Sequence, residues 1–212
     1  GSEMCIRDSD FSNNIKKRLN YELTNDQTNA LNEINKDLKS EEKMFRLLQG
    51  DVGSGKTIVA LISCLNVVNS GYQVAFMAPT EILAYQHYKL AQSLIKDKMK
   101  IGFLTSKTDY SERKKIINDL ETSKINILFG THSVFQEKIN YKKLGLVVID
   151  EQHKFGVKQR KKLSDKGGKN CDVLVMSATP IPRTMIMTVF GDMDITIIKQ
   201  KPKNRKPVKT YS

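Results

Sequence analysis

Short apolar runs alternate along the chain with longer stretches of helical periodicity. Apolar runs typical of β-strands occur at 44–48, 73–77, 100–104, 125–129, 146–150, 172–177 and 194–198. Apolar residues spaced as on one face of a helix occur at 56–69, 81–97, 110–121 and 182–189. Strands that alternate with helices of this length predict an α/β domain with a mostly parallel sheet and helices on both faces. Function is then expected at the carboxyl ends of the strands.

The first predicted strand end carries a glycine-rich segment, LLQGDVGSGKT at 47–57. Its pattern matches the phosphate-binding loop and lies between a strand and a helix, as that motif requires. Glycines let backbone N–H groups surround the phosphates of ATP, Lys56 adds a charge for the β and γ phosphates, and Thr57 can ligate Mg²⁺. A chance glycine-rich turn is the alternative, which the complete pattern disfavours. The predicted binding segment is Gly50, Asp51, Val52, Gly53, Ser54, Gly55, Lys56 and Thr57.

The run LVVIDEQHKFG, residues 146–156, places two adjacent carboxylates directly after an apolar strand. A strand-end aspartate near a phosphate loop can hold the Mg²⁺ that bridges the β and γ phosphates, and a neighbouring glutamate can activate the attacking water. We assign Asp150 to the metal and Glu151 to the water. Two carboxylates that cap a following helix are the alternative. The phosphate loop favours the catalytic interpretation.

The charge of the chain suggests a class of partner. Thirty-five Lys and Arg against 23 Asp and Glu give a net charge of +12, and clustered cations attract the phosphate backbone of nucleic acids. A solvated lysine-rich surface is the alternative. The same two interpretations apply to 153–169, where seven Lys or Arg accompany one Asp: this stretch extends a DNA track or forms a solvated helix.

Other classes of protein are disfavoured. The longest apolar run, 58–68, is interrupted by Ser63 and Asn66 and is too short to span a membrane. The three cysteines are odd in number and lack a CxxC pair, so they indicate neither a disulfide framework nor a zinc cluster and predict a reducing compartment. The three histidines lack the i, i+4 spacing of helical metal sites.

The chain divides into three segments. In residues 1–9, Gly1 and Ser2 resemble a cloning remnant, and MCIRDS at 4–9 back-translates to a sequence that resembles a transposon end used in sequencing libraries. We therefore expect residues 1–9 to be a non-native leader. Residues 10–198 hold the predicted domain. Residues 199–212 are basic, contain two prolines and have no apolar period, which predicts an exit linker.

Several motifs together resemble those of superfamily 2 helicases and translocases. DEQH at 150–153 and SATPIPRT at 177–184 resemble motifs II and III, beside the phosphate loop as motif I. MAPTEILAYQH at 77–87 and FGTHSVFQ at 129–136 resemble motifs Ia and Ib, and YELTNDQ at 21–27 resembles the adenine-recognition segment. Within the superfamily the motifs are most similar to the RecG family. The resemblance implies a RecA-like P-loop NTPase domain.

The resemblance implies roles for these residues. Gln27 would recognise adenine, and Gln152 and His153 would sense the γ phosphate, with Gln152 counted among the catalytic residues. Ser177 and Thr179 would couple hydrolysis to the DNA track, although hydroxyls at a strand end are otherwise more often a turn or cap. Contacts to the DNA backbone rather than to bases would come from N–H and hydroxyl donors. The implied DNA-binding residues are Pro79, Thr80, Gly130, Thr131, His132 and Arg183.

The resemblance also implies partners. Superfamily 2 motors use two RecA-like lobes, the second of which supplies an arginine finger, and RecG adds a wedge domain that grips branched DNA. We expect the chain to be the first lobe of a bacterial, cytoplasmic, ATP-dependent DNA helicase that remodels forks and Holliday junctions, and to be nearly inactive by itself. Two alternatives stay open: the motor lobe of a transcription-repair coupling translocase, and a nucleotide-gated DNA-binding module without turnover, against which Glu151 argues.

Overall fold

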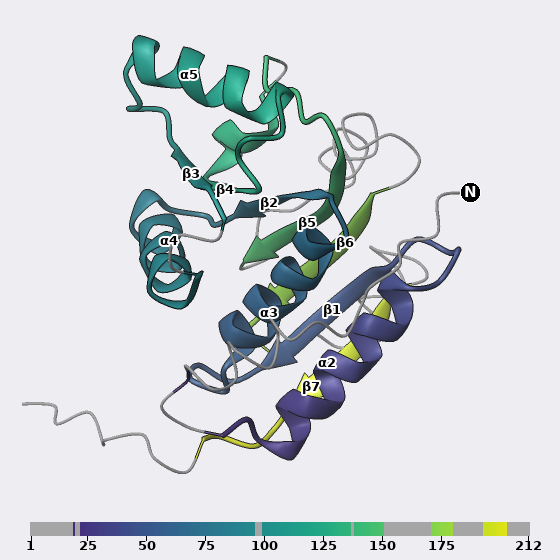
Figure 1. Cartoon of the computed structure of the whole chain (residues 1–212). Coiled ribbons are helices and arrows are strands. Elements are labelled where there is room, and N and C mark those ends of the chain that lie inside the picture. The colour runs from purple at the N-terminus through teal and green to yellow at the C-terminus, as the bar shows by residue number, and fades with distance from the viewer. Residues whose placement is uncertain are drawn as a thin grey trace, which may run out of the picture.

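The strands form one parallel sheet. A computed structural model of the chain describes residue 19 and residues 22–95, 99–136, 138–150, 171–179 and 193–202. Within these residues, seven strands are ordered β3-β4-β2-β5-β6-β1-β7 (Figure 1), and all neighbours run parallel. The strands are β1 (Phe45–Gly50), β2 (Gln73–Met77), β3 (Ile101–Leu104), β4 (Ile127–Gly130), β5 (Leu144–Asp150), β6 (Asp172–Ser177) and β7 (Asp194–Ile198).

Helices cover both faces of the sheet, as predicted. They are α2 (Asn25–Leu38), α3 (Lys56–Asn69), α4 (Glu81–Ile95), α5 (Tyr110–Glu121) and the 3₁₀ turn η2 (His132–Phe135). The first three pack with alternate strand residues such as Phe76 and Val148 in one core, and α5 and η2 pack with Ala75 and Val147 on the opposite face. Figure 1 shows α2 and α3 beside β1, with α4 near β3 and β4. In the described part of the chain, no helix combines the length and apolarity needed to cross a membrane.

Most predicted elements agree with the structure, with differences at some ends. The predicted bounds of β2, β6, β7, α3 and α5 coincide with the observed ones. β1 extends past the predicted end at 48 to Gly50, and β5 begins two residues early at Leu144, because backbone pairing continues where the apolar pattern stops. The predicted helix at 182–189 lies outside the described residues, and so does the segment 151–170.

Helix α2 was absent from the predicted elements. Its signal was nevertheless present: Thr24 accepts the N–H of Gln27, and the Gln27 side chain accepts the N–H of Thr24, which is a capping box. Ala30, Leu31 and Ile34 then lie on the buried face. Charged and amide residues occupy the other face, so the apolar residues recur at the spacing of an amphipathic helix.

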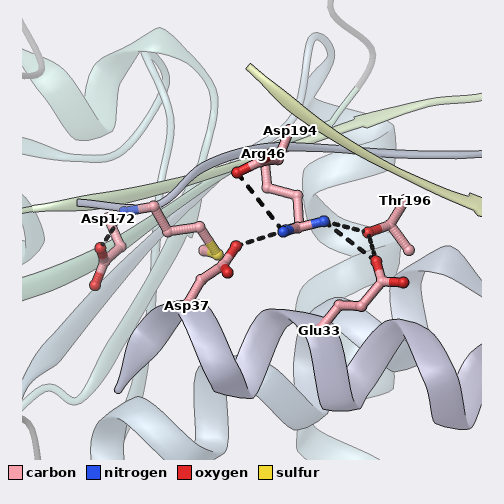
Figure 2. A network of polar contacts seen from close by, with 7 residues as sticks. Glu33, Asp37, Arg46, Asp172, Asp194 and Thr196 are labelled. Carbon is pink, nitrogen blue, oxygen red and sulfur yellow. Dashed lines mark hydrogen bonds and ion pairs between the residues drawn. The ribbon is translucent and has the colours of Figure 1, made fainter. Parts of the chain in front are cut away.

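A buried arginine joins α2 to the sheet edge (Figure 2). Arg46 of β1 is 8% exposed and donates to Asp37 at 2.7 Å and to Glu33 at 3.2 Å, both on α2. It also donates to Thr196 of β7 at 2.7 Å and pairs with Asp194 at 3.7 Å. A planar guanidinium has enough donors to satisfy several partners at once. One side chain thus ties α2, β1 and β7 together.

A buried carboxyl contacts the backbone at the same, amino-terminal end of β1. Asp172, 2% exposed at the start of β6, accepts the N–H of Met44 at 2.9 Å. Burial raises the pKa of Asp172 to about 6, although the Met44 hydrogen bond and the nearby Lys43 charge act in the other direction. The ionised form is therefore penalised in the folded protein. Since the unfolded carboxyl ionises near 3.8, this penalty grows as the pH rises from about 4 to 6.

We expect Asp172→Asn to stabilise the fold at neutral pH. Asparagine keeps an oxygen for the Met44 N–H and removes the buried charge. The free energy of unfolding should rise by about 2–3 kcal/mol at pH 7.5, and the gain should vanish near pH 4. Urea unfolding at pH 4, 5, 6 and 7.5 measures this, with Glu41→Gln, which removes a charge at an exposed position, as the control. A gain that did not depend on pH would contradict the assignment.

Candidate functional site

The predicted nucleotide segments end neighbouring strands. β5 ends at Asp150, β6 at Ser177 and β1 at Gly50, and these strands are adjacent in the order β5-β6-β1. The register pairs Asp150 with Met176 and Gln49 with Ser177, so the three ends lie level. Because neighbouring strands are about 4.8 Å apart, segments far apart in sequence meet at one edge of the sheet.

The phosphate loop leaves β1 and enters α3 through two glycines in the left-handed conformation. Gly53 has a φ of 84° and Gly55 a φ of 87°, which residues with a side chain rarely adopt. Within this described loop and helix, Gly55 is an N-cap without a side-chain hydrogen bond, and the first turn of α3 has no acidic residue. The positive end of the helix is therefore not neutralised by the helix itself, which suits an anion.

The Lys56 ammonium lies over this loop. Its Nζ donates to the carbonyl oxygen of Gly50 and, at 3.0 Å, to that of Asp51. Lys56 is half-buried, whereas Asp51 and Val52 beside it are exposed, Val52 to 76%. A cation is thereby held beside an exposed loop at the N-terminus of a helix, an arrangement that suits a phosphate chain.

The segment predicted to recognise adenine lies against the loop. Gln27 is fully buried, and its Nε2 donates to the Ser54 carbonyl at 2.7 Å. A Cβ on Gly55 would lie 2.1 Å from the same Nε2, and a Cβ on Gly50 would lie 2.7 Å from the Ile198 carbonyl. The loop therefore fits between α2 and β7 because glycine occupies these two positions. The role of Gln27 toward adenine stays a prediction.

The chain beyond β7 also passes this site. Asp26, next to Gln27, accepts the N–H groups of Lys199 and Gln200, each at 2.9 Å. The ammonium of Lys201 lies 3.5 Å from the carboxylate of Asp51 in the loop. The first residues of the predicted exit linker are thus bonded to both the adenine-recognition segment and the phosphate loop.

Asp150, the predicted metal ligand, contacts a histidine. Its Oδ2 lies 2.6 Å from Nε2 of His87 on α4, and the two side chains are 13% and 10% exposed. Glu151, Gln152 and His153, predicted to activate water and sense the γ phosphate, lie outside the described residues.

The donor set fits ATP with Mg²⁺. The Ser54 hydroxyl in the loop is buried and, among the described residues, has no hydrogen-bond partner, as expected of a loop that receives a further group. Thr57, in the first turn of α3, and Asp150 would hold the metal. No group of three or more His, Cys, Asp or Glu in the described ranges could hold a metal ion. Mg²⁺ beside a nucleotide requires one or two protein ligands, because phosphates and waters supply the rest.

The predicted DNA residues follow two paired strands. Met77 of β2 pairs with Gly130 of β4, and the Ala78 N–H donates to the Gly130 carbonyl at 2.9 Å. Pro79 and Thr80 therefore lie beside the segment that continues from Gly130. The continuing residues Thr131 and His132 are half-buried and exposed, respectively.

Some of these residues also have structural roles. Thr80 begins α4, where its hydroxyl accepts the Leu83 N–H at 3.3 Å and its carbonyl accepts the Ala84 N–H at 3.0 Å. A Cβ on Gly130 would lie 2.0 Å from the Leu104 carbonyl, which requires glycine there. Arg183, predicted on the same face, lies outside the described residues.

The predicted coupling pair is in contact. Ser177, fully buried at the end of β6, lies 3.2 Å from Thr179 between the hydroxyl oxygens, and the Thr179 N–H donates to the Ser177 hydroxyl at 3.3 Å. Sequence reasoning missed His87 and Asp26 at this edge. Neither stands in a sequence pattern that marks its partner, since Asp150 and Lys199 are distant in the chain.

Comparison with known proteins decides the family. A family model for the DEAD/DEAH box helicases matches residues 24–188. The chain belongs to this family. As a DEAD/DEAH box helicase domain it is 49% identical over 205 residues to the ATP-dependent DNA helicase RecG of Aquifex aeolicus, covering 96% of this chain and 26% of that protein. It is 50% identical over 195 residues to RecG of Thermotoga maritima, covering 92% and 25%. The chain thus spans about a quarter of the length of these relatives.

Solved structures support the fold of this helicase domain. A structure of RecG bound to a three-way DNA junction matches with a TM-score of 0.80 and 43% identity, over 94% of this chain and 27% of that chain. The DEAD-box helicase Mss116, solved with single-stranded RNA and UDP-BeF, matches with a TM-score of 0.70 and 20% identity, over 96% and 45%. The second likeness concerns the fold alone. Together they confirm the predicted RecA-like lobe.

We expect Gly55→Ala to disturb both the loop and Gln27. Gly71→Ala is the matched control, because Gly71 also has a positive φ, of 84°, but no atom lies within 4 Å of the place that its Cβ would take. The control should cost about 1 kcal/mol for the left-handed backbone. Gly55→Ala should cost a further 1–3 kcal/mol, roughly the value of a lost buried hydrogen bond, and should weaken nucleotide binding.

Urea unfolding and titration with a fluorescent ATP analogue measure the two effects. Adding Gln27→Ala to Gly55→Ala should recover part of the lost stability, because the clashing amide is removed. Equal losses for the two glycine variants, with nucleotide binding unchanged in both, would contradict the close approach of Gln27.

Proposed function

We propose that the chain is the ATP-binding lobe of an ATP-dependent DNA helicase that remodels branched DNA, such as replication forks and Holliday junctions. The observation that carries the proposal is the likeness, at 43% identity over 94% of this chain, to RecG bound to a three-way DNA junction. The identity of 49–50% to RecG of two bacteria supports it. This favours RecG-like activity over a transcription-repair coupling translocase.

The nucleotide chemistry is assigned to one edge of the sheet. Lys56 and the loop N–H groups bind the β and γ phosphates, and Glu151 activates the attacking water. Thr57 and Asp150 hold Mg²⁺, which offsets negative charge on the phosphates. Gln152 and His153 sense the γ phosphate. The support from the structure is that β5 ends at Asp150 level with the end of β1, where the Gly50 carbonyl accepts the Lys56 ammonium.

DNA is assigned to the neighbouring strand ends. The proposed DNA-binding residues lie at or just after the ends of β2 and β4. β2 adjoins β5 and β4 lies beyond β2, so both are on the far side of Asp150 from the phosphate loop. These residues are Pro79, Thr80, Gly130, Thr131 and His132. Backbone N–H and hydroxyl groups there suit contacts to DNA phosphates, which set position without reading bases. Arg183 belongs to the same proposed face.

Coupling between the two sites is assigned to the hydroxyl pair at the end of β6. Ser177 and Thr179 lie between the strands that carry Asp150 and Gly50, and they contact each other. We assign them to relaying the state of the γ phosphate to the DNA-binding residues. The complete protein supplies the remaining partners, a second RecA-like lobe and a wedge domain, in accord with relatives about four times the length of this chain.

Lys56→Ala tests the nucleotide site and the function together. The variant loses a charge-assisted contact to phosphate worth about 1.5–3 kcal/mol, so ATP affinity should fall at least about tenfold. Calorimetric titration of the chain with ATP and Mg²⁺ measures this. Lys114→Ala, which removes the same charge from an exposed position on α5, should bind ATP normally.

The full-length protein should separate the strands of a three-way junction in the presence of ATP, and Lys56→Ala should abolish this. A linear duplex of equal length is the control substrate and should be processed far more slowly. If the intact protein bound ATP yet processed both substrates equally, the assignment to branched DNA would fail.

The chain tested by itself should hydrolyse ATP very slowly, with or without forked DNA. The donors on the described residues come from one lobe, and an arginine finger from an opposing lobe is worth about 10³ to 10⁵ in rate in phosphoryl transfer. A steady-state ATPase assay of residues 10–212 beside the full-length protein measures the difference. Brisk, DNA-stimulated turnover by the short chain would mean that it carries a complete catalytic site.

A further inference from the structure

His87 is placed unusually for a histidine on an amphipathic helix. It is 8% exposed, its Nε2 lies 2.6 Å from Oδ2 of Asp150, and its ring packs on Phe76 of β2 with the centroids 5.0 Å apart. β2 and β5 are neighbours in the sheet, so α4 reaches over β2 to the end of β5. The contact joins motif Ia, on α4, to the aspartate proposed to hold Mg²⁺.

The contact fixes the Asp150 carboxylate. A carboxylate that is largely withdrawn from water requires hydrogen bonds, because its desolvation is costly. Across the described segments, 22–95, 99–136, 138–150, 171–179 and 193–202, the side-chain partner of this carboxylate is His87. With Oδ2 engaged by the ring, rotation of the carboxylate is restricted.

α4 connects this contact to the proposed DNA face. The helix begins directly after Thr80, whose hydroxyl and carbonyl accept the N–H groups of Leu83 and Ala84 in its first turn. His87 follows Thr80 by seven residues, which is two helical turns on the same face and about 10 Å along the axis. A helix transmits a displacement at one end as a rigid body. A phosphate bound at Thr80 would therefore act on the position of the His87 ring.

We propose that His87 is a positioning residue that orients Asp150 for Mg²⁺ and carries the effect of DNA bound at Pro79 and Thr80 to the metal. The proposal rests on the proposed function. Hydrogen-bond partners of metal ligands set ligand orientation, and their loss typically lowers metal affinity about 10- to 100-fold. His87 thus provides a route from DNA to the nucleotide that is separate from the Ser177 and Thr179 pair.

A histidine that merely fills space makes a different prediction. The ring packs on Phe76 in the core, so a space-filling role predicts that any bulky apolar replacement keeps function and that loss of stability is the main effect. A positioning role predicts that the hydrogen bond matters. His87→Gln retains a donor at a similar reach, His87→Asn retains a donor on a shorter side chain, and His87→Leu retains volume without a donor.

The test is the Mg²⁺ concentration that half-saturates the binding of a fluorescent, non-hydrolysable ATP analogue by the chain, with and without forked DNA. Wild type and His87→Gln should have similar requirements, and DNA should lower both. His87→Leu and His87→Asn should need at least about tenfold more Mg²⁺, and DNA should no longer change the requirement. Gln86→Leu, at an exposed neighbour on α4, should behave as wild type.

The outcomes separate the two proposals. If the wild-type chain bound the analogue without needing Mg²⁺, the proposed nucleotide chemistry would be wrong. If wild type needed Mg²⁺ but His87→Leu, folded by circular dichroism, needed no more, the positioning role would be wrong. Should His87→Leu fail to fold, the comparison of His87→Asn with His87→Gln decides: equal Mg²⁺ requirements overturn the role, and a higher requirement for His87→Asn supports it.

Discussion

Neighbouring strands of the described sheet all run parallel. Each strand enters the sheet at the same edge and leaves at the other, because the chain returns over a crossover connection between strands. The register holds the ends of β5, β6 and β1 level. Residues from several motifs are therefore brought together at the carboxyl ends of the strands, although those motifs are far apart in the sequence.

The phosphate loop depends on elements that are not part of it. The Gln27 side chain of α2 packs closely against Gly55, and the Ile198 carbonyl of β7 packs closely against Gly50. α2 and β7 are themselves held to β1 by Arg46. A substitution in this buried ion network would therefore move α2 or β7, and with them the groups that pack against the loop, although the network itself does not contact the loop.

The sequence predicted what local patterns encode. The phosphate loop, the strand before Asp150 and the bounds of α3 and α5 follow from glycine spacing and apolar periodicity, which are properties of neighbouring residues. α2 was missed although its capping box and its apolar spacing are both local signals. β1 was predicted too short because Gln49 and Gly50 pair through the backbone. The contact of His87 with Asp150 was beyond prediction. The contact exists because β2 and β5 are neighbours in the sheet. The sequence of a strand does not reveal which other strand it pairs with.

The bonds between Asp26 and the N–H groups of Lys199 and Gln200 have a mechanical consequence. They anchor the chain after β7 beside the nucleotide loop, and Lys201 touches Asp51 of that loop. The backbone after β7 is thus held by α2 and by the loop at the same time. A loop that shifted on binding phosphate would therefore pull directly on the segment that leaves the sheet.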